Sequence, residues 1–226
     1  FRRVLFRSGL ARHHVEQYSS AIADYDKAIS LQPDNTNALY GRGLDYYYSG
    51  KFDQAIKDYS LVIDLAPAPD ALLNRGSAYF SKGQFREASA DFGRAIQLKP
   101  NYAEAFYNRG NTKMAMGDFD DAITDFSRAI ALKPDYAEAY YNRASTYTSK
   151  NDYARAIADY NQVLKLRPSD VSTLINRCWA RAVDGGDFQG ALEDCDAAIA
   201  ANGTSAVAHD TKGFAQLRMG RNEDAL

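Results

Sequence analysis

The side chains best suited to chemistry in this chain are its histidines and cysteines, and there are few of either. The chain has 226 residues, among them three His and two Cys. His13 and His14 are consecutive, so they point to different faces of a helix, whereas two metal ligands on one helix need a spacing of three or four residues. His13 and Glu16 have that spacing, but no third ligand accompanies them. We therefore predict a solvated helix here and no metal site.

Catalytic motifs are also missing from the sequence. It contains no Gly-rich phosphate loop, no nucleophile elbow and no pair of catalytic carboxylates. Lys and Arg total 27 against 29 Asp and Glu, which gives a net charge of −2 without a long block of either sign. This balance argues against a nucleic-acid or membrane-surface binder, and no apolar run approaches the roughly 18 residues of a membrane span. We expect neither enzyme activity nor a cofactor.

The elements that must position any functional side chain are set by an internal repeat of 33 to 35 residues. One recurring residue is proline, at Pro33, Pro67, Pro100, Pro134 and Pro168. A second recurring position holds a small residue, with Gly43, Gly76, Gly110, Ala144, Cys178 and Gly213. A third is an alanine with an aromatic residue three positions before it, as in Phe119 and Ala122. A fixed period of this length is typical of a solenoid.

One repeat, near residues 101–134, indicates how each period folds. Residues 103–116 contain no helix breaker except Gly110, and they predict a first helix. From Phe119 to Ile130, apolar residues recur at helical spacing, which predicts a second helix with one apolar face. We expect the two antiparallel helices to cross at Gly110, where bulk would push them apart. Neither helix buries its apolar face alone, so hairpins must stack on their neighbours.

This pattern resembles the tetratricopeptide repeat (TPR) family. The resemblance is carried by AEAFYNRGNTKMAMGDFDDAITDFSRAIALKP at 103–134 and AEAYYNRASTYTSKNDYARAIADYNQVLKLRP at 137–168. It implies an all-α fold, a right-handed superhelical solenoid of antiparallel helix hairpins whose first helices line a concave groove. The single array of 9–226 divides into a partial repeat 9–35, full repeats 36–68, 69–102, 103–136, 137–170 and 171–205, and a partial repeat 206–226. The style of the repeats resembles bacterial members.

Both ends of the chain are interpreted as cut. Residues 1–8, FRRVLFRS, fit no repeat landmark and can be encoded by the tail of a common short-read sequencing adapter, so we predict that they are not native. The true N-terminus would then be missing, and targeting signals cannot be judged. We take the cytoplasm as the default location. The uncapped ends make self-association a further expectation.

Three unusual residues fall on positions that the repeat places inside. Cys178 replaces a crossing glycine and Cys195 replaces a core aromatic of the same hairpin, and antiparallel geometry could bring the two near each other. A redox switch needs exposed, activated thiols, so we predict that both cysteines are reduced core residues. His209 replaces a Leu, Phe or Tyr of the other repeats and is predicted to be a packed ring rather than a catalyst.

Charged residues follow the same period. An arginine directly precedes the crossing residue at Arg42, Arg75, Arg109, Arg143 and Arg177. An aspartate precedes the core residue of each second helix at Asp24, Asp58, Asp91, Asp125, Asp159 and Asp194. The planar guanidinium binds a carboxylate through two hydrogen bonds, so we predict an internal Arg–Asp ladder. The alternative is that the arginines clamp a ligand.

The best functional pattern is a series of asparagines immediately before those arginines, at Asn74, Asn108, Asn142 and Asn176. Each amide offers both a donor and an acceptor, so four in register could bind the backbone of an extended chain whatever its sequence. The series resembles the asparagine ladder of O-linked N-acetylglucosamine transferase, which holds extended polypeptides. The alternative is that each Asn serves local hydrogen bonds only.

Further recognition residues are expected beside these asparagines. They are Tyr40, Tyr47, Tyr107, Asn111, Tyr141 and Trp179. Tyr and Trp are favoured in recognition surfaces. We therefore predict a protein-interaction scaffold or adaptor that binds an extended peptide or partner protein in the groove. Two alternatives stay open: a substrate-recruiting arm of a larger enzyme, such as a glycosyltransferase whose catalytic domain lies outside this chain, and a structural or self-associating solenoid.

Overall fold

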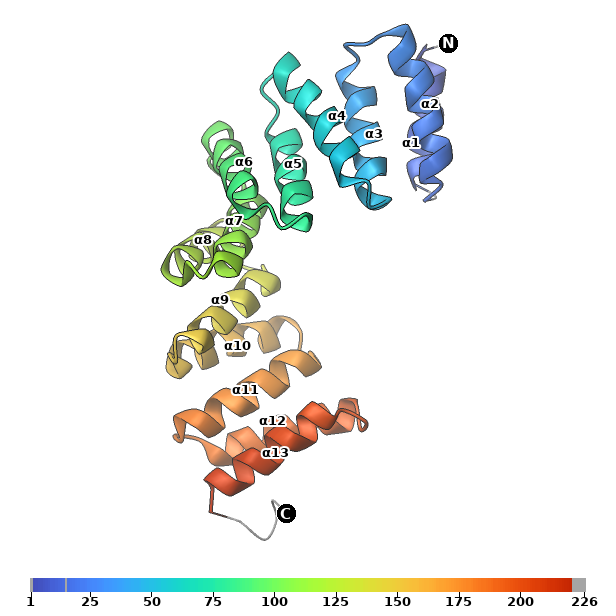
Figure 1. Ribbon diagram of the computed structural model, residues 1–226. Coiled ribbons are helices and arrows are strands. Elements are labelled where there is room, and N and C mark those ends of the chain that lie inside the picture. The colour runs from blue at the N-terminus through green and yellow to red at the C-terminus, as the bar shows by residue number, and fades with distance from the viewer. Residues whose placement is uncertain (1, 15, 221–226) are drawn as a thin grey trace. The chain divides into compact units, whose positions relative to one another are not determined.

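All secondary structure in the described part of the chain is helical. The computed structural model describes residues 2–14 and 16–220, and within them thirteen helices follow one another without a strand (Figure 1). They are α1 (Arg2–His14), α2 (Tyr18–Leu31), α3 (Thr36–Tyr48), α4 (Phe52–Leu65), α5 (Pro69–Ser81), α6 (Phe85–Leu98), α7 (Ala103–Met116), α8 (Phe119–Leu132), α9 (Ala137–Ser149), α10 (Tyr153–Leu166), α11 (Val171–Asp184), α12 (Phe188–Ala201) and α13 (Ala206–Arg218).

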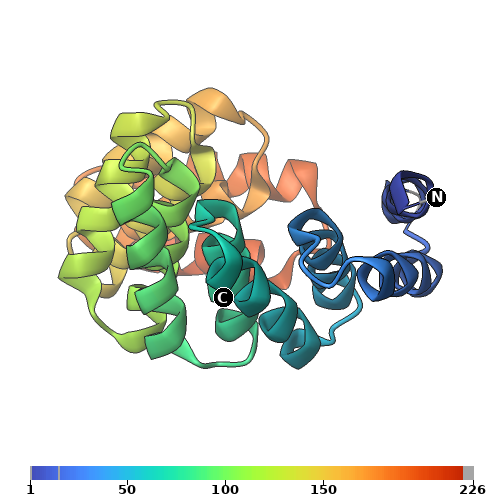
Figure 2. The ribbon, with the colours of Figure 1, turned by 90° about the horizontal axis from the view of Figure 1, so that it is seen from above.

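The helices form two compact units, an N-terminal unit of residues 1–116 and a C-terminal unit of residues 117–226. Within each unit every helix packs against the next one along the chain. First helices also contact the first helix of the next repeat, as α3 does with α5 and α11 with α13. The orange and red helices α11 to α13 lie side by side in both ribbon views (Figures 1 and 2). This stacking confirms the predicted all-α solenoid of helical hairpins.

An aromatic ring of the second helix covers the crossing glycine of the first. A Cβ on Gly76 would lie 2.7 Å from Cε1 of Phe92, and a Cβ on Gly43 would lie 2.8 Å from Cε1 of Tyr59. Both rings are almost completely buried. The ring occupies the volume that any larger side chain at the crossing would need, so the predicted exclusion of bulk is confirmed at Gly43 and Gly76.

Helix α1 runs through the boundary predicted at residue 9. Gly9 is a further crossing glycine, because a Cβ there would lie 2.7 Å from Cε1 of Tyr25. Ser8 takes the place that Arg42 has one repeat later, and its hydroxyl donates to Oδ2 of Asp24 at 2.7 Å. The non-native origin of residues 1–8 stays a prediction, which their nucleotide sequence tests.

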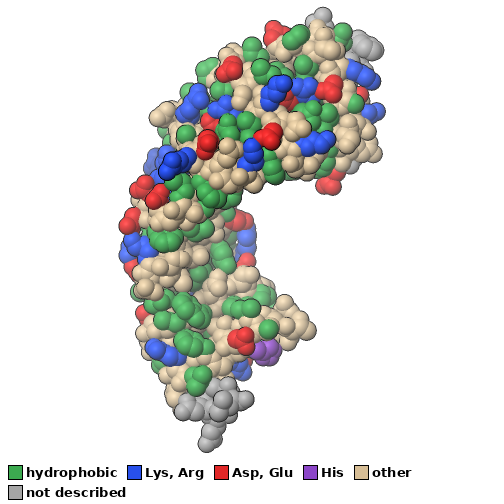
Figure 3. Space-filling view, viewed as in Figure 1, with side chains coloured by type: hydrophobic (Ala, Val, Ile, Leu, Met, Phe, Trp, Pro, Cys, Tyr) green, Lys and Arg blue, Asp and Glu red, His purple; other side chains and the backbone are tan. Residues whose placement is uncertain are grey.

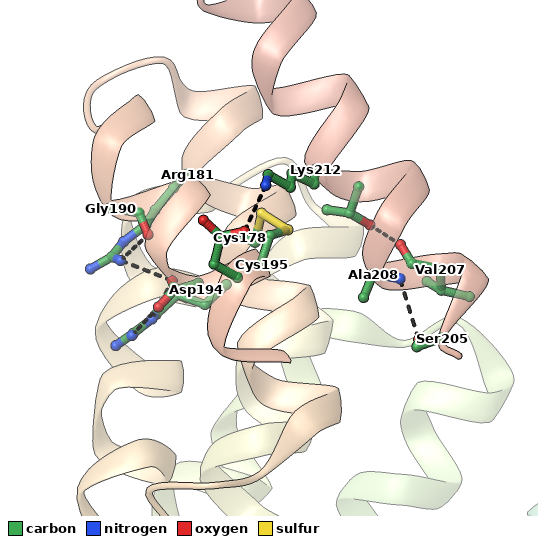
Figure 4. Close-up of a disulfide and its surroundings, with 12 residues drawn as sticks. Cys178, Arg181, Gly190, Asp194, Cys195, Ser205, Val207, Ala208 and Lys212 are labelled. Atoms are coloured by element: carbon green, nitrogen blue, oxygen red, sulfur yellow. Dashed lines mark hydrogen bonds and ion pairs between the residues drawn. A yellow bond between two sulfur atoms is a disulfide. The ribbon is translucent and has the colours of Figure 1, made fainter. Parts of the chain in front are cut away.

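The C-terminal unit fills one crossing with a covalent bond. Cys178 of α11 and Cys195 of α12 are joined by a disulfide, with their Cα atoms 5.7 Å apart, and both are fully buried (Figure 4). The prediction of reduced thiols was therefore wrong. Replacing both the glycine and the ring of one crossing by cysteine sets two short side chains face to face, and a Cα separation of this size is ordinary for a disulfide.

Two predictions about histidines were also wrong. His13 is not solvated, because its Nδ1 lies 2.6 Å from Oδ1 of Asp45, a fully buried carboxylate of α3. The side chain of His14 lies outside the described residues. His209 is exposed instead of packed, and its Nε2 lies 3.2 Å from the carbonyl oxygen of Gly203 in the loop before α13. The ring is thus turned toward this loop and away from the core.

Candidate functional site

The candidate site is the face of the first helices that carries the predicted asparagines, taken in each unit by itself, and we call it the first-helix face. Asn74 lies on α5 and Asn108 on α7 in the N-terminal unit, whereas Asn142 lies on α9 and Asn176 on α11 in the C-terminal unit. All four are half-buried. Each precedes an arginine of the predicted ladder, so the backbone that places the arginine inside also presents the amide at the edge of the core.

Asn74 and Asn176 are hydrogen-bonded to the preceding repeat. Nδ2 of Asn74 donates to the hydroxyl oxygen of Tyr40 at 2.8 Å, and Nδ2 of Asn176 donates to that of Tyr141 at the same distance. Burial is the largest cause that raises the pKa of Tyr40, so its phenol stays protonated at neutral pH. The alternative that each Asn serves local hydrogen bonds is thus confirmed for the amide N–H groups of Asn74 and Asn176. In each Asn–Tyr pair the tyrosine hydroxyl accepts this bond, and its own O–H can still donate to another group.

Asn108 differs because the repeat before it has no tyrosine. Leu73 stands at the place that Tyr40 and Tyr141 hold in the two hydrogen-bonded pairs. A leucine offers no hydrogen bond, and the amide of Asn108 makes no side-chain hydrogen bond to the described residues. Its carbonyl oxygen on the main chain accepts from Thr112 at 2.7 Å, as expected inside a helix. Asn108 therefore presents an unused donor and acceptor.

A cavity of about 140 Å³ opens beside Asn108, and we call it the niche. It lies in the N-terminal unit and is lined by Tyr47, Ser77, Phe80, Phe92, Asn108 and Asn111. Three aromatic rings and two amides meet there without a charged side chain. The structure thus brings together three residues that the sequence predicted as recognition residues, Tyr47, Asn108 and Asn111.

The other predicted residues do not join them in one site. Tyr40 borders a second cavity of about 330 Å³, together with Val62, Pro69 and Asp70. Tyr107 is half-buried on α7. Trp179 on α11 is 37% exposed, and its ring packs edge-on against Tyr153 with the centroids 5.6 Å apart. The predicted set is therefore distributed along the two units.

Sequence reasoning missed Ser77, Phe80 and Phe92 as lining residues of the niche. Phe80 could have been found, because it occupies the place of Tyr47 one repeat later. Phe92 had been assigned to the core, and it is 1% exposed. The ring nevertheless borders the niche.

The Arg–Asp pairing predicted from the sequence is confirmed within each unit. Arg75 of α5 donates from Nε and Nη2 to the two carboxylate oxygens of Asp91, each at 2.7 Å. Hydrogen bonds to Asp91 are the largest cause that raises the pKa of Arg75. The same two-bond pairing joins Arg42 to Asp58, Arg143 to Asp159 and Arg177 to Asp194.

Each of these arginines also reaches the second helix of the preceding repeat. The acceptors of Nη1 are Asp26 for Arg42, Ser60 for Arg75, Ser127 for Arg143 and Asn161 for Arg177, at 2.6 to 2.8 Å. The arginine side chains are 14 to 18% exposed. All three donor nitrogens are thus used inside the stack, which contradicts a ligand clamp and makes these arginines connectors between hairpins.

Metal-binding clusters are absent from the described residues, and charges of both signs are mixed on one face of the molecule. Lys and Arg are interspersed with Asp and Glu on the face shown in Figure 3. Within residues 2–14 and 16–220, no group of three His, Cys, Asp or Glu side chains could hold a metal ion. In the same range no helix combines the length and the apolar character needed to cross a bilayer.

An all-α stack of hairpins joined by buried arginines, with amides and aromatic rings on its first helices, defines a helical-repeat solenoid. Tetratricopeptide repeat models match residues 107–171 and 36–68, and a TPR repeat model matches residues 9–47 and 76–117. The chain belongs to the tetratricopeptide repeat family.

Known proteins resemble the chain over different lengths. The serine/threonine-protein phosphatase T of Trypanosoma brucei brucei is 38% identical over 58 residues, which are 26% of this chain and 12% of that protein. The MamA chain in its crystal structure has 26% sequence identity to this chain and a TM-score of 0.68, and the match covers 73% of this chain and 96% of the MamA chain. The structure of YrrB, described as a TPR protein with an unusual peptide-binding site, is 23% identical with a TM-score of 0.64, over 75% of this chain and 88% of that one. The last likeness shows the fold alone.

Proposed function

We propose that this chain is a scaffold that binds an extended peptide, or an extended segment of a partner protein, along the first-helix face of a unit. The observation that carries the proposal is Asn108, whose amide faces a cavity lined by aromatic rings and has no hydrogen-bond partner among the described side chains. A polar group at the edge of an apolar cavity is well placed to fix the orientation of a ligand. Family membership supports the same class of function, and nothing in the niche suggests catalysis.

The four asparagines are proposed to bind the main chain of this partner. Asn74 and Asn176 keep their carbonyl oxygens for a partner N–H, while the tyrosine hydroxyls bound to them can donate to a partner C=O. Tyr107, Asn111 and Trp179 are proposed to add side-chain contacts. The description of YrrB as a TPR protein with an unusual peptide-binding site is in keeping with a peptide ligand, by analogy of fold alone.

The test combines Asn108→Ala with Asn142→Ala. Peptides selected from a display library against the wild-type chain would be labelled, and their binding measured by fluorescence anisotropy. We expect the affinity to fall about tenfold, because two peptide-binding amides are lost. A control pair, Gln97→Ala with Lys165→Ala, changes exposed residues of second helices and should bind as the wild type does. Equal binding by both double variants, with unchanged thermal unfolding, would reject the asparagine ladder.

A second candidate function is a substrate-recruiting arm of a larger enzyme. It is favoured by the likeness to a segment of a protein phosphatase, a match that spans 12% of that protein. The gene sequence on either side of these 226 residues distinguishes the candidates. A reading frame that continues into a catalytic domain favours the arm, and one that closes after a further helix favours the scaffold.

A further inference from the structure

The niche is built to hold a group in place. The ring of Tyr47 is packed edge-on against Phe52 with the centroids 5.6 Å apart, and the ring of Phe80 lies 5.4 Å from that of Phe85. Both supporting rings begin the following second helix. Phe92 is fixed by its burial in the core. Because the neighbouring rings already support these walls, a ligand that enters the niche has little side-chain ordering to do.

The polar groups of the niche are neutral and of both kinds. The hydroxyl of Ser77 donates to the carbonyl oxygen of Leu73 at 2.9 Å, so it offers a ligand only its acceptor lone pairs. Asn108 offers an amide donor and an amide acceptor, since Leu73 cannot bind it as Tyr40 binds Asn74. The substitution of tyrosine by leucine one repeat earlier thus creates an amide that is free to recognise a partner.

The chemistry of the niche separates the possible occupants. A carboxylate would find no cation there, and an ammonium group would find no carboxylate, so either charge would be desolvated without compensation. An aliphatic side chain would leave both polar atoms of Asn108 without a partner. A carboxamide matches them, because its N–H donates to Oδ1 and its oxygen accepts from Nδ2. Its flat body also suits a space between aromatic rings.

We propose that the niche is a specificity pocket for an Asn or Gln side chain of the bound peptide. This inference rests on the proposed function, since it assumes that an extended peptide lies along the first-helix face. It adds selectivity to a ladder that would otherwise bind any main chain. Recognition through paired hydrogen bonds discriminates strongly against occupants that cannot make them, because the site's own polar groups then stay unpaired.

The experiment is a positional scan with decapeptides that are acetylated and amidated, in which each position is fixed in turn as Gln, Asn, Glu, Lys or Leu and the others are random. For the wild-type chain we expect one position where Gln or Asn binds about tenfold better than Glu, Lys or Leu. The decisive variant is Leu73→Tyr, which should give Asn108 the same internal partner that Asn74 has. In this variant the preference for Gln or Asn at that peptide position should fall below about twofold. The contributions of the other peptide positions to binding should be retained.

Two further variants complete the scan. Asn108→Leu should also lose the preference, whereas Gln97→Leu, a change at an exposed position of a second helix, should keep it. A preference absent from the wild type, or unchanged in Leu73→Tyr, overturns the pocket while leaving the scaffold in place. Failure of every decapeptide pool to bind any of the four chains overturns the scaffold and the pocket together.

Discussion

Arg75 and Asp91 share two hydrogen bonds of 2.7 Å across one hairpin, and the same guanidinium reaches the hydroxyl of Ser60 in the preceding hairpin at 2.8 Å. Three helices are therefore held by one side chain. The carboxylate is 4% exposed, so it depends on the arginine for its compensation.

Replacement of this arginine by an apolar residue is expected to destabilise the stack. Arg75→Met leaves Asp91 buried without its cation and should lower the free energy of unfolding by about 3–5 kcal/mol. Arg75→Met combined with Asp91→Leu removes both charges and should recover most of that loss. Urea unfolding followed by circular dichroism measures both variants. A wild-type midpoint for Arg75→Met would show that the pair contributes nothing to stability.

Gly93 identifies a place where the connection between hairpins can be improved. It stands where Ser60 and Ser127 accept from the arginines of the next repeat, and a Cβ there would lie 3.6 Å from Nη1 of Arg109. Gly93→Ser should therefore add a hydrogen bond worth about 0.5–1.5 kcal/mol and also remove a glycine from the middle of α6, worth about 0.5–1 kcal/mol.

The two contributions of Gly93→Ser can be separated. Gly93→Ala reports the helix effect alone, and thermal unfolding of Ser and Ala variants in the presence and absence of Arg109→Met forms a double-mutant cycle. The extra stability of Gly93→Ser over Gly93→Ala should become smaller in the Arg109→Met background. An advantage that persists in the Arg109→Met background would mean that the new hydroxyl binds another group.

The fold could be predicted because the proline, the small crossing residue and the aromatic–alanine pair each recur in several repeats. The Arg–Asp pairing followed from one arginine and one aspartate per repeat. The third partner of each arginine could not be predicted, because the four partners are of three residue types, with Asp26, Ser60, Ser127 and Asn161. The niche was also out of reach, since it depends on how Leu73 leaves the amide of the next repeat unbound. A departure from the repeat is visible in the sequence, but its consequence needs the geometry.

The disulfide is expected to replace the packing that a ring provides elsewhere. Cys178 and Cys195 are separated by 17 positions, and a cross-link that closes a loop of this size contributes about 3 kcal/mol. A reducing agent should therefore lower the melting temperature of the wild type. The variant Cys178→Gly with Cys195→Phe restores the pair seen at Gly76 and Phe92, and its melting temperature should not respond to reductant.

A thiol assay provides the control for this prediction. The wild type unfolded without reductant should show no free thiol, and full reactivity of both cysteines would contradict the bridge. A persistent disulfide is typical of proteins in oxidising compartments, so the same assay on protein taken from its native cells also tests the cytoplasmic default.

Asp45 is expected to make the stability of the N-terminal unit depend on pH. It stands where Ala78, Thr112 and Thr146 lie in later repeats, and its Oδ2 has no partner among the described residues. Burial is the largest cause that raises the pKa of Asp45, and the hydrogen bond with His13 only partly opposes it. The folded state therefore holds the proton of Asp45 more tightly than the unfolded state does.

The sign of the effect follows from linkage. Because the pKa of Asp45 is higher in the folded chain, its contribution to stability is fully present below the ordinary Asp pKa of about 3.9 and is lost as pH rises through the folded value. Asp45→Thr should then be more stable than the wild type at pH 7, with the difference shrinking as the pH falls toward 4. Urea unfolding across this pH range measures the difference in the free energy of unfolding between variant and wild type. Asp34→Asn, a change at an exposed residue, is the control and should unfold as the wild type does. A loss of stability in Asp45→Thr at pH 7 would mean that the contact with His13 outweighs the cost of burying the carboxylate.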